Sequence, residues 1–127
     1  MACPLCAYFI ISSDQHSTYD AINSIFINLV MQRVIDYADT RPTLTCDVPV
    51  HFLLEEMPNL GEIKDIKKKL GVARSRRVGM SLLFQNIPQM KDRYRGSVWE
   101  ELIGGCDVRI YLGCNEMTTA RTYSEYT

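Results

Sequence analysis

Two acidic side chains and one amide stand at the ends of two apolar runs in this 127-residue chain. The run from Val50 ends in the adjacent acids Glu55 and Glu56, and the run from Val78 ends in Gln85. If both runs are buried parallel strands, their carboxyl ends bring these side chains to one edge of a sheet. Carboxylates there can hold the water shell of Mg²⁺ and orient or deprotonate an attacking water, while an amide can hydrogen-bond that water or a γ-phosphate. The pattern indicates half of an ATPase site.

The other half of such a site is a Gly-x-x-x-x-Gly-Lys-Ser/Thr loop, whose backbone amides bind phosphates. No Gly in the chain is followed by Lys, so this loop does not occur. We therefore expect the chain alone to bind ATP poorly, because most phosphate contacts come from the loop. An alternative stays open, in which Glu55 and Glu56 begin a solvated loop and Gln85 is a loop residue that caps the next helix.

Three arginines, Arg74, Arg76 and Arg77, stand just before the second apolar run. A guanidinium at this place could reach phosphate in the same subunit, or across an interface as an arginine finger. The alternative is a plain basic surface.

A lysine cluster at Lys67, Lys68 and Lys69 precedes these arginines, in a chain whose net charge is −1. The balanced total argues against a nucleic-acid footprint over the whole surface, so such a contact would come from a local patch. This cluster could track a phosphate backbone. A solvated helix face is the alternative reading.

Apolar runs and helix signals alternate along the chain. We expect strands over residues 7–12, 50–55, 78–85 and 108–112, and helices over 17–37, 63–76, 87–94, 99–103 and from 116 onward, the last capped by Asn115. Strands alternating with helices predict an α/β fold with a parallel sheet flanked by helices. Neither a repeat nor a Pro/Gly/Ser-rich linker divides the sequence. Residues 1–127 should form a single domain.

Longer motifs resemble the nucleotide-binding domain of conjugative type IV secretion coupling proteins, the TraG/TraD-like ATPases. The similar segments follow in the family's order from about Cys6 to the end: Cys6-Ala-Tyr-Phe with Ser13-Asp-Gln-His-Ser-Thr-Tyr, residues 50–61, Arg74-Ser-Arg, Phe84-Gln-Asn-Ile-Pro-Gln-Met, and Trp99-Glu-Glu-Leu-Ile-Gly-Gly-Cys-Asp with Tyr111-Leu-Gly. Three positions depart from the family pattern. Glu55 stands where the family usually has Asp, Arg77 replaces a Gly, and Gly105 replaces an Asn.

The resemblance implies the C-terminal half of a RecA-like motor domain, that is, a partial P-loop NTPase fold without the half that carries the phosphate-binding loop. It implies that Glu56 is the catalytic glutamate, Gln85 the γ-phosphate sensor and Arg74 the finger reaching a neighbouring subunit. Glu55 would hold Mg²⁺ through water. ATP and Mg²⁺ would be the cofactors of the complete parent domain, and whether this chain alone is an enzyme stays open.

By the same resemblance, the parent would form a hexameric ring that pumps single-stranded DNA, delivered with a relaxase complex, into a type IV secretion channel. The motor would be cytoplasmic and held at the inner face of the cell membrane, with membrane contact only through an N-terminal segment missing here. A second hypothesis is a truncated, non-enzymatic remnant. Exposed sheet edges and an arginine face would let such a remnant self-associate or dock on an intact motor.

Overall fold

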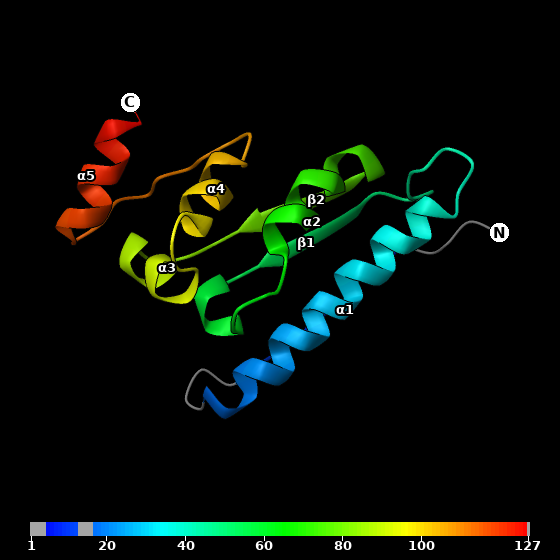
Figure 1. Cartoon of the computed structure of the whole chain (residues 1–127), viewed down its shortest axis with the longest axis horizontal. Helices are drawn as coiled ribbons and strands as arrows, with labels where there is room; N and C mark the ends of the chain where they lie inside the picture. Colours follow the sequence, from blue (N-terminus) through cyan, green and yellow to red (C-terminus); the bar gives the residue numbers. More distant parts are fainter. Residues whose placement is uncertain (1–4, 13–16, 127) are drawn as a thin grey trace.

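The computed structural model describes residues 5–12 and 17–126. Its elements are the 3₁₀ turn η1 (Ser17–Tyr19), α1 (Asp20–Asp39), β1 (Val50–Leu54), η2 (Met57–Leu60), α2 (Ile66–Ala73), η3 (Arg74–Arg76), β2 (Val78–Leu82), α3 (Ile87–Arg93), α4 (Val98–Gly104) and α5 (Met117–Glu125). Figure 1 shows the two strands in the middle of the molecule, with α1 along one side and α5 at one end.

Strands β1 and β2 pair in parallel, from Val50 opposite Val78 to Leu54 opposite Leu82. The connection between them passes through α2, as a parallel pair requires a crossover. Burial alternates along β1: Leu54 is buried, whereas His51 and Leu53 are exposed. The helices therefore pack on one face of the sheet. The expected α/β fold with a parallel sheet is confirmed in this coarse form.

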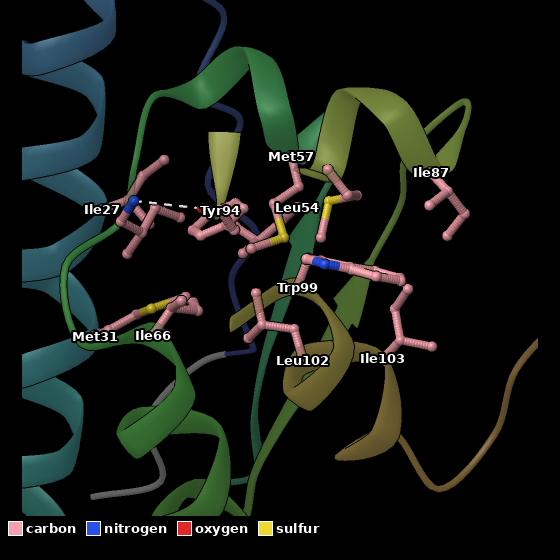
Figure 2. Close-up of a cluster of buried hydrophobic side chains, with 12 residues drawn as sticks. Ile27, Met31, Leu54, Met57, Ile66, Ile87, Tyr94, Trp99, Leu102 and Ile103 are labelled. Carbon is pink, nitrogen blue, oxygen red and sulfur yellow. Dashed lines mark hydrogen bonds between the residues drawn. The ribbon is translucent and has the colours of Figure 1, made fainter. Parts of the chain in front are cut away.

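Helix α1 covers the core because its apolar residues recur every three or four positions. Ile27, Met31, Ile35 and Ala38 are all buried on one side of the helix. Figure 2 shows two of them, Ile27 and Met31, beside the main cluster of buried side chains. That cluster joins α1, β1, η2, α2, α3 and α4, so the two strands are held by helices from both halves of the chain.

Two of the four expected strands do not form. Residues 7–12 and 108–112 carry no strand, and no backbone hydrogen bond ties either segment to another part of the described chain. An apolar run marks a segment that can be a strand, but a strand exists only where a second strand pairs with its backbone. The sheet described by the structure accordingly has two strands.

The start of α5 also differs from the expectation, because Glu116 and not Asn115 is its N-cap. The Glu116 carboxylate accepts hydrogen bonds from the backbone N–H of Thr118 and of Thr119. Burial would raise the pKa of Glu116, but these hydrogen bonds outweigh it and hold the pKa at about 2. A carboxylate at this position also complements the positive end of the helix dipole.

Tyr94 is the largest fully buried side chain among the described residues, and its hydroxyl binds the loop between η2 and α2. It accepts a hydrogen bond from the backbone N–H of Ile63 at 3.3 Å and donates to the carbonyl of Gly61 at 3.4 Å. The dashed line in Figure 2 marks the first of these contacts. Burial raises the pKa of Tyr94 to about 12, although the Ile63 N–H acts in the opposite direction.

We expect this phenol to make stability depend on pH under alkaline conditions. A folded pKa raised from the unfolded value of about 10 contributes stability that is complete below pH 10 and is lost as pH rises toward 12. The loss should amount to roughly 2–3 kcal/mol. Urea denaturation of the wild type and of Tyr94→Phe across this pH range should show a flatter profile for the variant, and Tyr19→Phe is the exposed control. Equal slopes for wild type and Tyr94→Phe would contradict this.

None of the helices in the described part of the chain is both long enough and apolar enough to cross a membrane.

Candidate active site

The carboxyl ends of β1 and β2 bring the predicted acid and amide together. The Leu83 N–H donates to the Leu54 carbonyl at 3.0 Å, and the Met57 N–H donates to the Leu83 carbonyl at 2.9 Å. The segments that follow β1 and β2 therefore leave the sheet side by side. Just beyond them, the Gln85 Nε2 donates to the Glu56 Oε1 at 2.8 Å. The expected meeting of these two side chains is therefore seen. The exposed Glu55 precedes Glu56 at the same edge.

Glu56 has an unusual backbone, with φ 50° and ψ 44° in the left-handed region. For a residue with a side chain this conformation costs on the order of 1 kcal/mol. The turn is stabilised because the Asn59 N–H donates to the Glu56 carbonyl at 2.7 Å, and Pro58 lies in the first turn of the 3₁₀ helix η2. The Asn59 side chain also donates to the Glu56 Oε2 at 3.3 Å. The carboxylate is thus held from both sides by amide groups.

Gln89 is a further polar residue at this edge that the sequence reasoning missed. Its Nε2 lies 3.5 Å from the Gln85 Oε1, and its own Oε1 is buried without a hydrogen-bond donor among the residues that the structure describes. A buried acceptor without a protein donor is a place where an ordered water is expected. The available signal was its position four residues after Gln85, at the start of a helix that Asn86 caps.

A cleft of about 340 Å³ opens beside this cluster, and Gln89 and Asn59 belong to its wall. Arg93 holds the elements around the cleft together. Its Nε donates to the Pro58 carbonyl at 2.7 Å, and its Nη2 donates to the Asp20 carboxylate at 2.9 Å. The guanidinium is therefore engaged in joining η2, α1 and α3. The cleft lies next to Glu56 and Gln85, but neither side chain lines it.

The structure does not bring Arg74 to this edge. Arg74 lies in η3, before β2 begins, whereas Gln85 follows the end of that strand. The five residues of β2 separate them by roughly 16 Å. The Arg74 side chain is 81% exposed and donates to the Asp107 carboxylate at 3.1 Å. Within one chain, Arg74 and Glu56 therefore belong to opposite ends of the sheet.

The other two arginines of the cluster hold the chain together. The Arg76 Nε donates to Asp39 at 2.8 Å, which joins η3 to the end of α1. Arg77 donates to the carbonyls of Cys46 and Asp47, at the loop that enters β1. Both side chains are held by partners in the folded chain, whereas the carboxylate partner of Arg74 is itself largely exposed.

The three lysines of α2 point to different neighbours. Lys67 pairs with Glu101, and this hydrogen bond holds the pKa of Glu101 below its usual range. Lys68 pairs with Asp65 at 3.3 Å, whereas Lys69 is buried and donates to the Lys64 carbonyl at 3.4 Å. These residues do not present one shared exposed face. A contact with DNA through them stays a prediction.

The sequence of this region matches a known protein family. Residues 49–127, well over half of the chain, match the family model described as the TraM recognition site of TraD and TraG. The match includes β1, β2 and all the residues of the carboxyl edge discussed above. Neither a curated protein nor a solved structure matches the chain significantly. The chain belongs to the TraG/TraD-like coupling-protein family, which places it in a conjugative context.

Proposed function

We propose that the carboxyl edge of β1 and β2 is the water-activating half of an ATPase site, in a RecA-like motor domain of a conjugative coupling protein. The observation that carries this proposal is the 2.8 Å hydrogen bond from Gln85 to Glu56, where two parallel strands end together. A solvated loop, the alternative for these residues, would not require a left-handed glutamate oriented by two amides.

The residues present fit the water and magnesium side of such a site. Glu55 is free to hold the water shell of Mg²⁺, and the unsatisfied Gln89 Oε1 can accept a hydrogen bond from a water near Glu56. Bound Mg²⁺ would neutralise charge on the phosphates of ATP. Glycines that cradle phosphate are not among the residues at this edge, which fits the proposal that the phosphate-binding loop belongs to the other half of the motor.

Glu56 would act as the general base. Its Oε1 is occupied by the Gln85 amide, so the more weakly bonded Oε2, 3.3 Å from the Asn59 nitrogen, is the atom that can take a proton from water. Gln85 would fix the carboxylate and present its own oxygen toward the same water or its nitrogen toward a γ-phosphate. The amide partners thus orient the base before the reaction, without supplying charge of their own.

Arg74 would serve a neighbouring subunit, because its exposed side chain lies at the opposite edge of the sheet from Glu56. A finger acting between subunits requires a homo-oligomer, and a hexameric ring is the assembly we propose. The parent would pump single-stranded DNA and its relaxase complex into a type IV secretion channel. The matched model's description also suggests TraM as a partner. We place the motor in the cytoplasm, anchored at the inner face of the membrane by a separate N-terminal segment.

The proposal can be tested by joining the phosphate-binding half of a TraG/TraD-like motor upstream of this chain and measuring ATP hydrolysis. We expect turnover that depends on Mg²⁺ in the joined protein, and turnover at background level with this chain alone. Binding of a fluorescent ATP analogue confirms that the joined protein is assembled. A joined protein that binds the nucleotide but does not hydrolyse ATP would contradict the proposal.

A further inference from the structure

Gln89 lies four residues after Gln85, and its side chain continues the pair formed by Gln85 and Glu56. The Gln85 Nε2 donates to the Glu56 Oε1 at 2.8 Å, and the Gln89 Nε2 lies 3.5 Å from the Gln85 Oε1. The three side chains therefore form a row in which the nitrogen of each amide faces the oxygen of the neighbour nearer to Glu56. Both contacts lie within the described part of this chain, so the row forms without any group from outside it.

The backbone that carries Gln89 is held at the start of α3. The Gln89 N–H donates to the Asn86 Oδ1 at 3.0 Å, and the Ile87 N–H donates to the hydroxyl of the buried Thr119 at 2.9 Å. The side chain of Ile87 is itself fully buried. Because these contacts fix the first turn of α3, Gln89 stays within reach of Gln85.

Only one orientation of each amide suits this row. Glu56, as a carboxylate, offers only acceptors, so the Gln85 amide turns its nitrogen toward Glu56 and its oxygen away. The Gln89 nitrogen then faces that oxygen, whereas the reverse orientation of Gln89 would set two acceptors against each other. In this orientation the Gln89 Oε1 is buried without a donor among the described residues. Such groups are uncommon in folded proteins, and a role at a functional site is one of the few explanations for them.

We propose that Gln89 is a positioning residue, which holds the Gln85 amide with its nitrogen toward Glu56. This role rests on the proposed ATPase function. When Glu56 takes a proton from water, its carboxyl group can donate as well as accept, and it no longer selects the orientation of Gln85. Gln89 holds the amide in the same orientation through this step. The Glu56 Oε1 therefore stays occupied, and Oε2 is ready for the next water once its proton has left to solvent.

The 3.5 Å separation of the two amides is long for a hydrogen bond, as is often the case for contacts of a catalytic site before substrate binds. We expect this contact to shorten in the joined motor domain with bound nucleotide.

ATP hydrolysis by the joined motor domain tests the catalytic consequence. Gln89→Leu should lower kcat about tenfold and leave KM for ATP within about twofold of the wild type, whereas Gln89→Glu, which replaces the donor by an acceptor, should lower kcat about 100-fold. Gln32→Leu is the matched control and should leave kcat unchanged, since Gln32 also donates to a residue four positions along its helix, Asp36, at 2.8 Å. In a Gln85→Ala background, Gln89→Leu should lower kcat no further, because Gln89 acts through Gln85.

A measurement on the chain alone separates the positioning role from the proposed ATPase function. Nitrogen-15 relaxation should show the Gln85 side-chain amide as a fixed group, with an order parameter of roughly 0.8, and Gln89→Leu should lower this value below about 0.6. Gln32→Leu should leave the order parameter unchanged.

Three results would overturn the role of Gln89 even where the joined motor hydrolyses ATP. They are a Gln85 amide that is equally ordered with and without Gln89, a kcat that ignores Gln89→Leu, and a loss of kcat that is the same with and without Gln85. If the order falls as expected but the joined motor binds nucleotide without hydrolysing it, the ATPase function fails and the positioning of Gln85 stands.

Discussion

Glu56→Gln is expected to lower the rate of ATP hydrolysis by the joined motor domain about 1,000-fold, since a positioned general base contributes roughly 10²–10⁴-fold. Glutamine has the same shape, and its carbonyl oxygen can still accept the hydrogen bond that Gln85 donates to Oε1 at 2.8 Å. The substitution therefore removes the basic oxygen and keeps the neighbouring geometry. The measurement is kcat under saturating Mg²⁺ and ATP, together with the Kd for the nucleotide.

Nucleotide binding should change little in this variant, because the phosphate contacts lie in the other half of the motor. Glu100→Gln is the matched control, since it makes the same chemical change at an exposed position of α4. A kcat for Glu56→Gln within a few-fold of the wild type would remove Glu56 from the role of base. Loss of nucleotide affinity in step with kcat would instead indicate that Glu56 acts in binding.

Arg74→Ala is expected to lower kcat by about 1,000-fold as well, at the lower end of the effect of an arginine finger. The side chain is largely exposed and its one carboxylate partner, Asp107, is also exposed, so the fold should keep its stability. The exposed Arg33→Ala in α1 provides the matched control. Hydrolysis rates and denaturation midpoints of both variants separate a catalytic effect from a structural one.

Mixing of subunits decides whether Arg74 acts on a neighbouring site. Glu56→Gln and Arg74→Ala are each inactive in their own rings, but a mixed ring contains sites that combine an intact Glu56 with an intact Arg74 from the next subunit. We expect mixed rings to recover a substantial part of the wild-type rate. If mixing restores nothing while the rings are shown to exchange subunits, Arg74 does not act between subunits.

Much of the fold was predictable because its signals are local. The expected bounds of α1, α3 and α4 lie close to those in the structure, because apolar spacing and the position of Pro88 are signals within the helix concerned. The parallel pairing of β1 and β2 follows from the helical crossover between them. The meeting of Glu56 with Gln85 then follows, because parallel strands end at the same edge.

Other features depended on groups far away in the chain. The segments 7–12 and 108–112 have the composition of strands, yet neither pairs with a second strand in the described structure, and composition alone does not provide that strand. Likewise, Lys67, Lys68 and Lys69 are consecutive in the sequence, but a helix turns successive side chains through about 100°, so they reach different neighbours.

By itself, then, the sequence determined the order of the helices, the parallel pair of strands and the polar side chains that follow those two strands. Only the tertiary structure decided the left-handed backbone of Glu56, the buried and unsatisfied Gln89 oxygen, and the separation of Arg74 from both. Periodicity and capping act between residues a few positions apart, and they are visible in the sequence. Hydrogen-bond partners, burial and strain arise where distant segments pack together, and a linear pattern does not contain them.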